Sequence, residues 1–278
     1  QRSRARAAWK GGSEAAAAQT LVAELSEQGI EKTTFTGFVE FAHQSGKIIG
    51  LLQENASIEK LECGSAGAMI VDVTPFYGES GGQVGDRGEV CTDNGHATVS
   101  DTQRLPGGLV IHSVDVKSGE LSIGDKVNLE IDTERRGNTA RNHTATHLLH
   151  AALRDRLGEH VRQAGSMVAP DHLRFDFSHF EPVDADQLAE LERDVNEVIR
   201  ADITMEVSEM SHREAIEQGA LAFFGDKYGD VVRVVNVPGI SRELCGGTHV
   251  VRTGEIGPFM IIKEESVAAG TRRIEAIT

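Results

Sequence analysis

The chain has 278 residues, a formal net charge of −15 and three cysteines. This length suffices for one large domain or two ordinary ones with buried cores. The acidic balance excludes indiscriminate nucleic-acid binding, DNA included, because bulk affinity for phosphate needs a basic surface, but a local basic track remains possible. No apolar run approaches the ~20 residues that span a bilayer, and the widely spaced cysteines make a poor disulfide framework. We therefore expect no membrane partner and a reducing, cytoplasmic setting.

Residues 1–60 are predicted to form a partly helical connecting segment. The Ala-rich stretch Glu14–Glu27 favours a helix, residues 34–41 indicate a short strand, and Gly46 and Gly50 interrupt the pattern. The chain opens without a methionine, so we expect it to be an internal piece of a longer protein.

Residues 61–135 are predicted to form a small antiparallel β-barrel. Short strand-like stretches recur at 69–73, 89–91, 97–100, 109–116 and 126–131, with Gly, Asp or Asn turns between them. The loop at 74–83 ends in Gly81-Gly82-Gln83 and carries more specific chemistry than a simple connection needs.

Residues 136–278 are predicted to form an α+β core, which makes the whole chain α+β. A helix is expected from about 138 to 157, ending at Gly158, and an amphipathic helix from about 185 to 200. Ser211 and Glu214 form a capping-box pattern that opens a further short helix. Strands are expected at 173–177, 231–237, 259–264 and 272–277.

Four residues of this core have the spacing of a metal site. His143 and His147 are four apart on the first helix, so their imidazoles lie one turn apart on the same face. Cys245 and His249 flank Gly-Gly-Thr, and glycine allows the tight turn that brings both side chains together. Three nitrogens and one sulfur suit tetrahedral Zn²⁺. The alternative is a helix with solvated histidines and a buried structural cysteine, and His150 is interpreted as a packing residue or an outer partner of the site.

Thr144 separates this pattern from a common class of zinc protease. In H-E-x-x-H proteases a glutamate follows the first histidine and acts as the general base. Because Thr144 stands there instead, peptide hydrolysis by that route is disfavoured.

The chain resembles the editing domain of alanyl-tRNA synthetase and the related free-standing alanyl-tRNA editing proteins. The motifs that carry the resemblance, in order, are residues 76–83 (FYGESGGQ), 141–150 (RNHTATHLLH), 165–168 (GSMV), 173–179 (LRFDFSH), 245–249 (CGGTH) and 270–276 (GTRRIEA). Threonyl-tRNA synthetase has a related core, but the Gly-Gly-Gln loop and the final motif favour the alanyl family.

This resemblance implies a translation-factor-type barrel followed by an editing core that binds zinc through the residues singled out above. It also implies a substrate, the acceptor end of alanine tRNA mischarged with serine or glycine, and the other domains of the synthetase as partners. An alanine pocket cannot strongly exclude glycine or fully reject serine, so a second site must hydrolyse the wrong esters. The first sixty residues would lead in from the aminoacylation domain.

Five further residues are candidates for the substrate site. Thr146 and Gln163 are candidate catalytic residues; the alternatives are a helix-interior threonine bonded to a carbonyl and a surface glutamine. Gln83, Arg174 and Asp176 are candidates for substrate binding, although Arg174 and Asp176 alternate on one strand and could form a structural ion pair instead. Candidates for local phosphate contacts, each with a solvated surface charge as the alternative, are Arg135, Arg136, Arg141, Arg162, Arg272 and Arg273.

The role of zinc stays open at this point. Four protein ligands are typical of a closed, structural site, whereas a catalytic zinc keeps one position for water or substrate. Zinc either shapes the pocket or loses a loose ligand and acts directly, and we favour the direct role. The competing function is a non-catalytic, zinc-stabilised tRNA-binding module.

Overall fold

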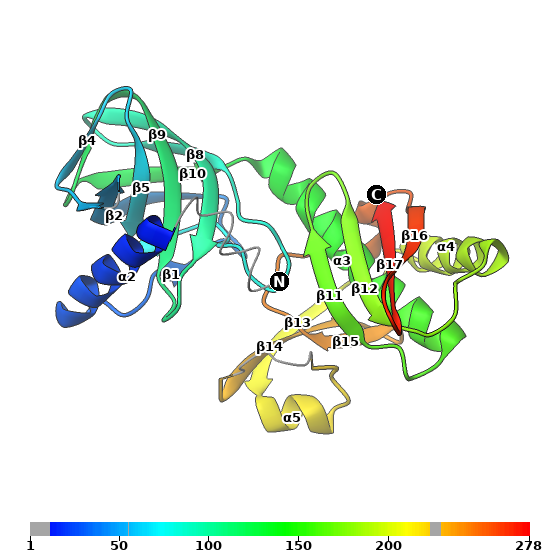
Figure 1. Cartoon of the computed structure of the whole chain (residues 1–278). Coiled ribbons are helices and arrows are strands. Elements are labelled where there is room, and N and C mark those ends of the chain that lie inside the picture. The colour runs from blue at the N-terminus through cyan, green and yellow to red at the C-terminus, as the bar shows by residue number, and fades with distance from the viewer. Residues whose placement is uncertain (1–11, 55, 223–228) are drawn as a thin grey trace. The chain divides into compact units, whose positions relative to one another are not determined.

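The computed structural model describes residues 12–54, 56–222 and 229–278, and its fold is α+β as predicted (Figure 1). The chain divides into two compact units, Gln1–Ser80 with Val84–Arg135, and Gly81–Gln83 with Arg136–Thr278. Each unit has its own buried apolar core. The domain boundaries expected at residues 60 and 135 stay a prediction.

The first unit contains the predicted antiparallel barrel. Its strands are β2 (Ala42–Gln53), β5 (Ala66–Val71), β7 (Gly88–Cys91), β8 (Gly95–Arg104), β9 (Val110–Ser122) and β10 (Lys126–Ile131). They pair in the order β10-β7-β8-β9-β5-β2, and β2 pairs again with β10, which closes the barrel. Alternating residues such as Val127, Leu129 and Ile131 of β10 are buried and fill the interior.

Short elements decorate the barrel. β3 (Ala56–Ser57) extends the sheet beside β2, and β4 (Lys60–Glu62) pairs with β9. β1 (Thr34–Phe35) pairs in parallel with β6 (Val73–Thr74). Helix α2 (Gly12–Glu27) buries Leu21 and Leu25 in a cluster with Leu52 and Ile70 of the barrel strands.

The sequence suggested that Gly46 and Gly50 interrupt the pattern, and this prediction is wrong. β2 runs through both, because each glycine admits a close neighbour. A Cβ on Gly50 would lie 3.0 Å from Leu21 Cδ2 of α2, and one on Gly46 would lie 3.2 Å from the Val73 carbonyl oxygen. The strand predicted at 34–41 is shorter in the structure, where β1 covers only Thr34–Phe35.

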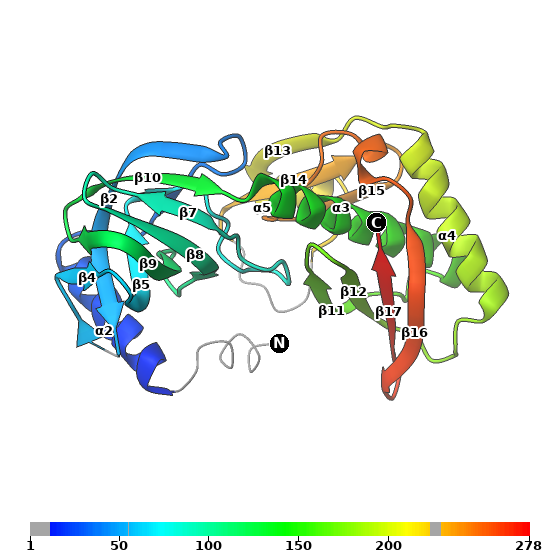
Figure 2. The ribbon, with the colours of Figure 1, turned by 90° about the horizontal axis from the view of Figure 1, so that it is seen from above.

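The second unit is built on the long helix α3 (Thr133–Leu157) and a four-stranded sheet. The sheet has the order β11-β12-β17-β16, formed by β11 (Gln163–Val168), β12 (Leu173–Ser178), β17 (Thr271–Ile277) and β16 (Met260–Ala268). Seen from above, α3 lies across this sheet and α4 (Ala185–Arg200) lies beside β16 (Figure 2). A smaller sheet, β13-β14-β15, contains β13 (Glu206–Ser211), β14 (Val231–Val237) and β15 (Ser241–Leu244).

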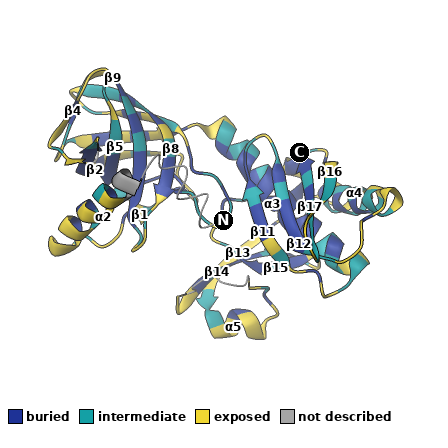
Figure 3. Cartoon of the chain, in the orientation of Figure 1, coloured by how far each residue is buried: buried dark blue, intermediate teal, exposed yellow. Residues whose placement is uncertain are grey.

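The helices of this unit bury apolar residues of their sequences in a shared core. The core joins Leu148 and Leu149 of α3 to Phe175 of β12 and Leu191 of α4. Figure 3 shows α3 largely buried, whereas α4 has one exposed side. The α4 N-terminus is closed by a capping box between Asp184 and Gln187.

The described part of the second unit also contains two short helices, the capped α5 (His212–Glu217) and the 3₁₀ helix η1 (Thr253–Ile256). Among the described residues, no helix is both long and apolar enough to cross a membrane.

Candidate metal centre

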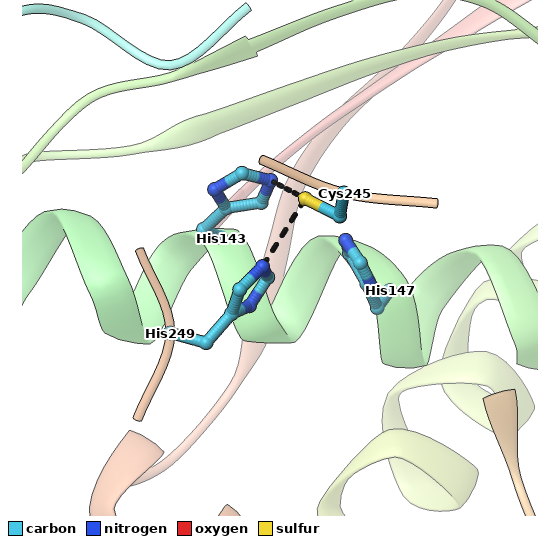
Figure 4. Close-up of side chains that lie close together, drawn as sticks. All are labelled: His143, His147, Cys245 and His249. Atoms are coloured by element: carbon cyan, nitrogen blue, oxygen red, sulfur yellow. Dashed lines mark hydrogen bonds between the residues drawn. The ribbon is translucent and has the colours of Figure 1, made fainter. Parts of the chain in front are cut away.

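The four predicted ligands lie together in the second unit. One nitrogen each of His143, His147 and His249 and the sulfur of Cys245 all lie within 4.8 Å of one another. Cys245 Sγ is 3.4 Å from His143 Nε2 and 3.2 Å from His249 Nε2. Figure 4 shows the side chains pointing toward one another, two from α3 and two from the segment after β15. The cluster could therefore hold a metal ion.

Helix geometry brings the two α3 ligands together, and two hydrogen bonds from an arginine side chain hold the ligand loop. His143 and His147 are one turn apart on α3, so both rings project from one face. The loop 245–249 follows β15 directly, and Arg233 of β14 fixes it by donating from Nη1 to the carbonyl oxygens of Cys245 at 2.8 Å and Gly247 at 2.9 Å.

Gly247 has a steric requirement that Gly246 lacks. A Cβ on Gly247 would lie 2.0 Å from His143 Cε1 and 2.8 Å from Gln83 Oε1, whereas a Cβ on Gly246 meets nothing within 4 Å. The second glycine of the pair therefore lets the loop pass directly over the His143 ring.

Each histidine of the cluster has a different polar neighbour at Nδ1, and the Nδ1 atoms of His143 and His249 form hydrogen bonds whereas that of His147 does not. His143 Nδ1 is 2.7 Å from Gln83 Oε1, and His249 Nδ1 is 3.1 Å from Thr144 Oγ1. His147 Nδ1 is 3.5 Å from Glu243 Oε2. Partners of this kind fix the ring orientation and the tautomer of metal-binding histidines. The arrangement leaves Nε2 of each ring for a cation.

The Thr144 hydroxyl that stands in place of a protease glutamate has a structural role here. It donates to the Ala140 carbonyl oxygen at 3.0 Å and accepts from the Val250 backbone N–H at 3.2 Å, besides its contact with His249. Thr144 thereby joins α3 to the far end of the ligand loop.

Glu243 is a buried carboxylate that the sequence analysis missed. Its Oε1 lies 3.0 Å from His150 Nδ1 and 3.1 Å from Ser241 Oγ, while Oε2 faces His147. Burial alone would raise the pKa of this carboxyl, but His147 and His150 hold it below its ordinary value. The available signal was an acidic residue two positions before Cys245, because alternate residues of an extended segment point to the same side. His150 is thus a buried neighbour of Glu243, and its interpretation as a packing residue or an outer partner of the site stays a prediction.

Burial sets the protonation of the cluster. It lowers the pKa of His143 and His249 well below the ordinary value, so both rings are neutral and can act as ligands. Burial raises the pKa of the Cys245 thiol to about 12 in the absence of a cation. A divalent cation stabilises the thiolate instead, because it supplies the positive charge that the buried surroundings lack.

The candidate catalytic residues come from α3 and β11. The Thr146 hydroxyl donates to the Asn142 carbonyl oxygen at 2.8 Å within α3. Gln163 begins β11 and lines a pocket of about 280 Å³. The other residues lining that pocket are His150, Arg154, Glu159, Arg162, Leu221 and Ala222. His150 therefore contacts both this pocket and Glu243, the partner of a predicted ligand.

Arg174 and Asp176 belong to a network of ion pairs on the four-stranded sheet. Asp176 accepts from Arg273 Nε at 2.6 Å and from Nη2 at 2.9 Å, and its Oδ1 is 3.6 Å from Arg174 Nε. Arg272 pairs in the same manner with Glu264 at 2.6 and 2.7 Å. Their assignments to substrate and tRNA stay predictions.

The other arginines named for tRNA are spread over α3 and the start of β11. Arg141 donates from Nε to the Glu255 carbonyl oxygen at 3.0 Å, Arg136 is buried, and Arg162 is exposed.

Comparison with known protein families gives two matches. A family model described as tRNA synthetases class II (A) matches residues 1–135, and one described as threonyl and alanyl tRNA synthetase second additional domain matches residues 232–275. The second match contains the ligand loop at 245–249. The matches therefore relate the first half of the chain to class II tRNA synthetases and the region of the ligand loop to the second additional domain of threonyl and alanyl tRNA synthetases.

Similar proteins define the family more closely. The alanine--tRNA ligase of Xanthomonas axonopodis pv. citri is 49% identical over 278 residues, which is 100% of this chain and 31% of that protein. That of Nitratidesulfovibrio vulgaris is 47% identical over 279 residues. That of Desulfosudis oleivorans is 51% identical over 254 residues, 91% of this chain and 29% of that protein. The chain belongs to the alanine--tRNA ligase family and spans about a third of the length of these relatives.

Proposed function

We propose that this chain is the editing part of an alanine--tRNA ligase and hydrolyses serine and glycine esters of alanine tRNA. The observation that supports this most directly is the cluster of three histidines and one cysteine, in a chain that matches the second additional domain of threonyl and alanyl tRNA synthetases. Zinc would be held by His143, His147, Cys245 and His249, because neutral imidazoles and one thiolate within 4.8 Å suit a tetrahedral Zn²⁺. Bound zinc supplies polarisation of an oxygen or a more acidic water.

Residues of the chain itself would recognise the serine hydroxyl and the tRNA end. Gln163 both donates and accepts hydrogen bonds, which suits recognition of the serine hydroxyl, and it lines a pocket beside His150 and two arginines. Those arginines, Arg154 and Arg162, carry the charge that the phosphates of a tRNA end require. Thr146, Gln83, Arg174 and Asp176 complete the proposed site. The full-length partners would be the acceptor end of alanine tRNA and the remaining ligase domains, in the cytoplasm.

Deacylation of serine-charged alanine tRNA tests this proposal. We expect the chain, loaded with one equivalent of zinc, to release serine and largely to spare alanine-charged tRNA. Cys245→Ala should lower the rate more than about 10-fold, since even an outer partner of a metal ligand is worth 10- to 100-fold. Cys91→Ala, at an exposed barrel position, should leave the rate unchanged.

The outcomes separate the two candidate functions. Loss of deacylation by Cys245→Ala with tRNA binding and fold retained supports the hydrolase, and loss of folding alone supports the zinc-stabilised binding module. Gln163→Ala removes no ligand, so it should keep zinc and fold while deacylation falls. If the zinc-loaded chain leaves the serine ester intact while the full-length ligase cleaves it, this part of the chain is inactive by itself.

A further inference from the structure

A short segment of the chain enters the metal-binding unit from the loop between two barrel strands. Gly81–Gln83 belongs to the second unit, although residues 80 and 84 on either side of it belong to the first. Val168 donates its backbone N–H to the Gly82 carbonyl oxygen at 2.8 Å, and Gln83 forms a parallel bridge with Val168. The segment is therefore attached to the end of β11.

The two glycines before Gln83 make this attachment possible. Gly81 has φ +60° and Gly82 has φ +91°, a region that residues with side chains rarely adopt. A Cβ on Gly82 would also lie 2.6 Å from the Ser166 carbonyl oxygen. The Gly-Gly pair delivers the side chain of Gln83, which is 0% exposed, into the core.

The Gln83 amide contacts both halves of the ligand set. Its Oε1 accepts from His143 Nδ1 at 2.7 Å and from the Thr248 backbone N–H at 2.9 Å. Its Nε2 donates to Thr248 Oγ1 at 2.9 Å. One amide thus joins the α3 ligand His143 to the loop that carries Cys245 and His249.

We propose that Gln83 is a positioning residue of the metal site, which sets the His143 ring and the ligand loop in register. This inference rests on the proposed zinc site and goes beyond it, because it gives the glycine-rich loop a role in metal binding. An oxygen acceptor at Oε1 keeps the His143 proton on Nδ1 and turns Nε2 to the cation. An apolar side chain of similar size would leave both the ring and the Thr248 N–H without an acceptor.

Zinc affinity, measured by competition with a chromogenic chelator, tests the role of Gln83 in the 278-residue chain. Gln83→Leu should weaken zinc binding 10- to 100-fold, the range for outer partners of metal ligands. Gln83→Glu keeps an oxygen facing His143 and Thr248, so it should restore affinity close to that of the wild type. The matched control is Gln103→Leu, which removes a buried barrel glutamine bonded to Glu79 and Asp101; its zinc affinity should not change.

Each result decides a separate question. If the wild-type chain binds no zinc, the proposed zinc site fails before Gln83 is tested. If the wild type binds zinc and Gln83→Leu binds it as tightly as Gln103→Leu does, the positioning role is overturned. If Gln83→Leu does not fold, Gln83→Glu decides: zinc affinity near that of the wild type supports the role, and a loss comparable to that of Cys245→Ala overturns it.

Discussion

Gly247 and Gly246 are adjacent in sequence and have opposite steric surroundings. Gly247→Ala would place a methyl group 2.0 Å from His143 Cε1, so the ring or the loop must move. We expect zinc affinity to fall more than about 10-fold and stability to drop by about 1–3 kcal/mol. Gly246→Ala, which meets nothing within 4 Å, should change neither quantity. Chelator competition and urea unfolding measure both, and equal effects of the two substitutions would contradict this account.

At the same scale, the ligands were predictable and most of their supports were not. The four-residue spacing on a helix and the glycine-spaced pair each fix the direction of two side chains, so convergence within each pair follows from local geometry. The supports Gln83 and Glu243 depend on tertiary pairing with α3, which spacing does not encode. The back-bond of the Thr146 hydroxyl to Asn142 is local, and it was one of the two alternatives that the sequence left open.

His112 of β9 makes the barrel sensitive to pH. Its ring is buried between Thr74 Oγ1 at 2.8 Å and the Met69 carbonyl oxygen at 3.2 Å, and burial lowers its pKa to about 4. In the unfolded state the His112 ring has a pKa near 6.5 and takes up the proton first. The stability that comes from burying the neutral ring is therefore complete above pH 6.5 and is lost as pH falls through 4. Between pH 7 and 4.5 the loss should be about 2–3 kcal/mol.

Urea unfolding at both pH values checks this, with His112→Gln as the comparison. The variant keeps a polar side chain but has no titrating ring, so its free energy of unfolding should fall less over the same interval. Equal pH dependence in the two proteins would show that His112 does not titrate in this range.

The elements differed in how well the sequence predicted them. The helix at 185–200 was predicted with its true bounds because its apolar face repeats at helical spacing, and the structure adds an N-cap at Asp184. The strand β2 was missed because its glycines suggested breaks. They accommodate α2 and a neighbouring strand instead, and such contacts between distant segments leave no periodic trace.

For the whole molecule, zinc should stabilise one unit selectively. At free zinc about 1,000-fold above the dissociation constant, binding contributes about 4 kcal/mol, which corresponds to a shift in Tm of roughly 10 °C for a unit of this size. Chelation should therefore lower that transition and speed hydrogen exchange in α3 and at 245–249. Exchange in the barrel strands β8 and β9 is the internal control, and an increase confined to the barrel would contradict a metal site in the second unit.

Because Gly81–Gln83 belongs to the second unit, it restricts where the chain can be truncated. A fragment starting at Arg136 would retain every proposed zinc ligand, yet it would lack the amide that faces His143. The complete surroundings of the ligands are not contiguous along the chain, and they are encoded on both sides of the strands β7 to β10. Truncations intended to isolate the metal-binding unit must therefore start upstream of residue 81 or supply those residues through a new connection.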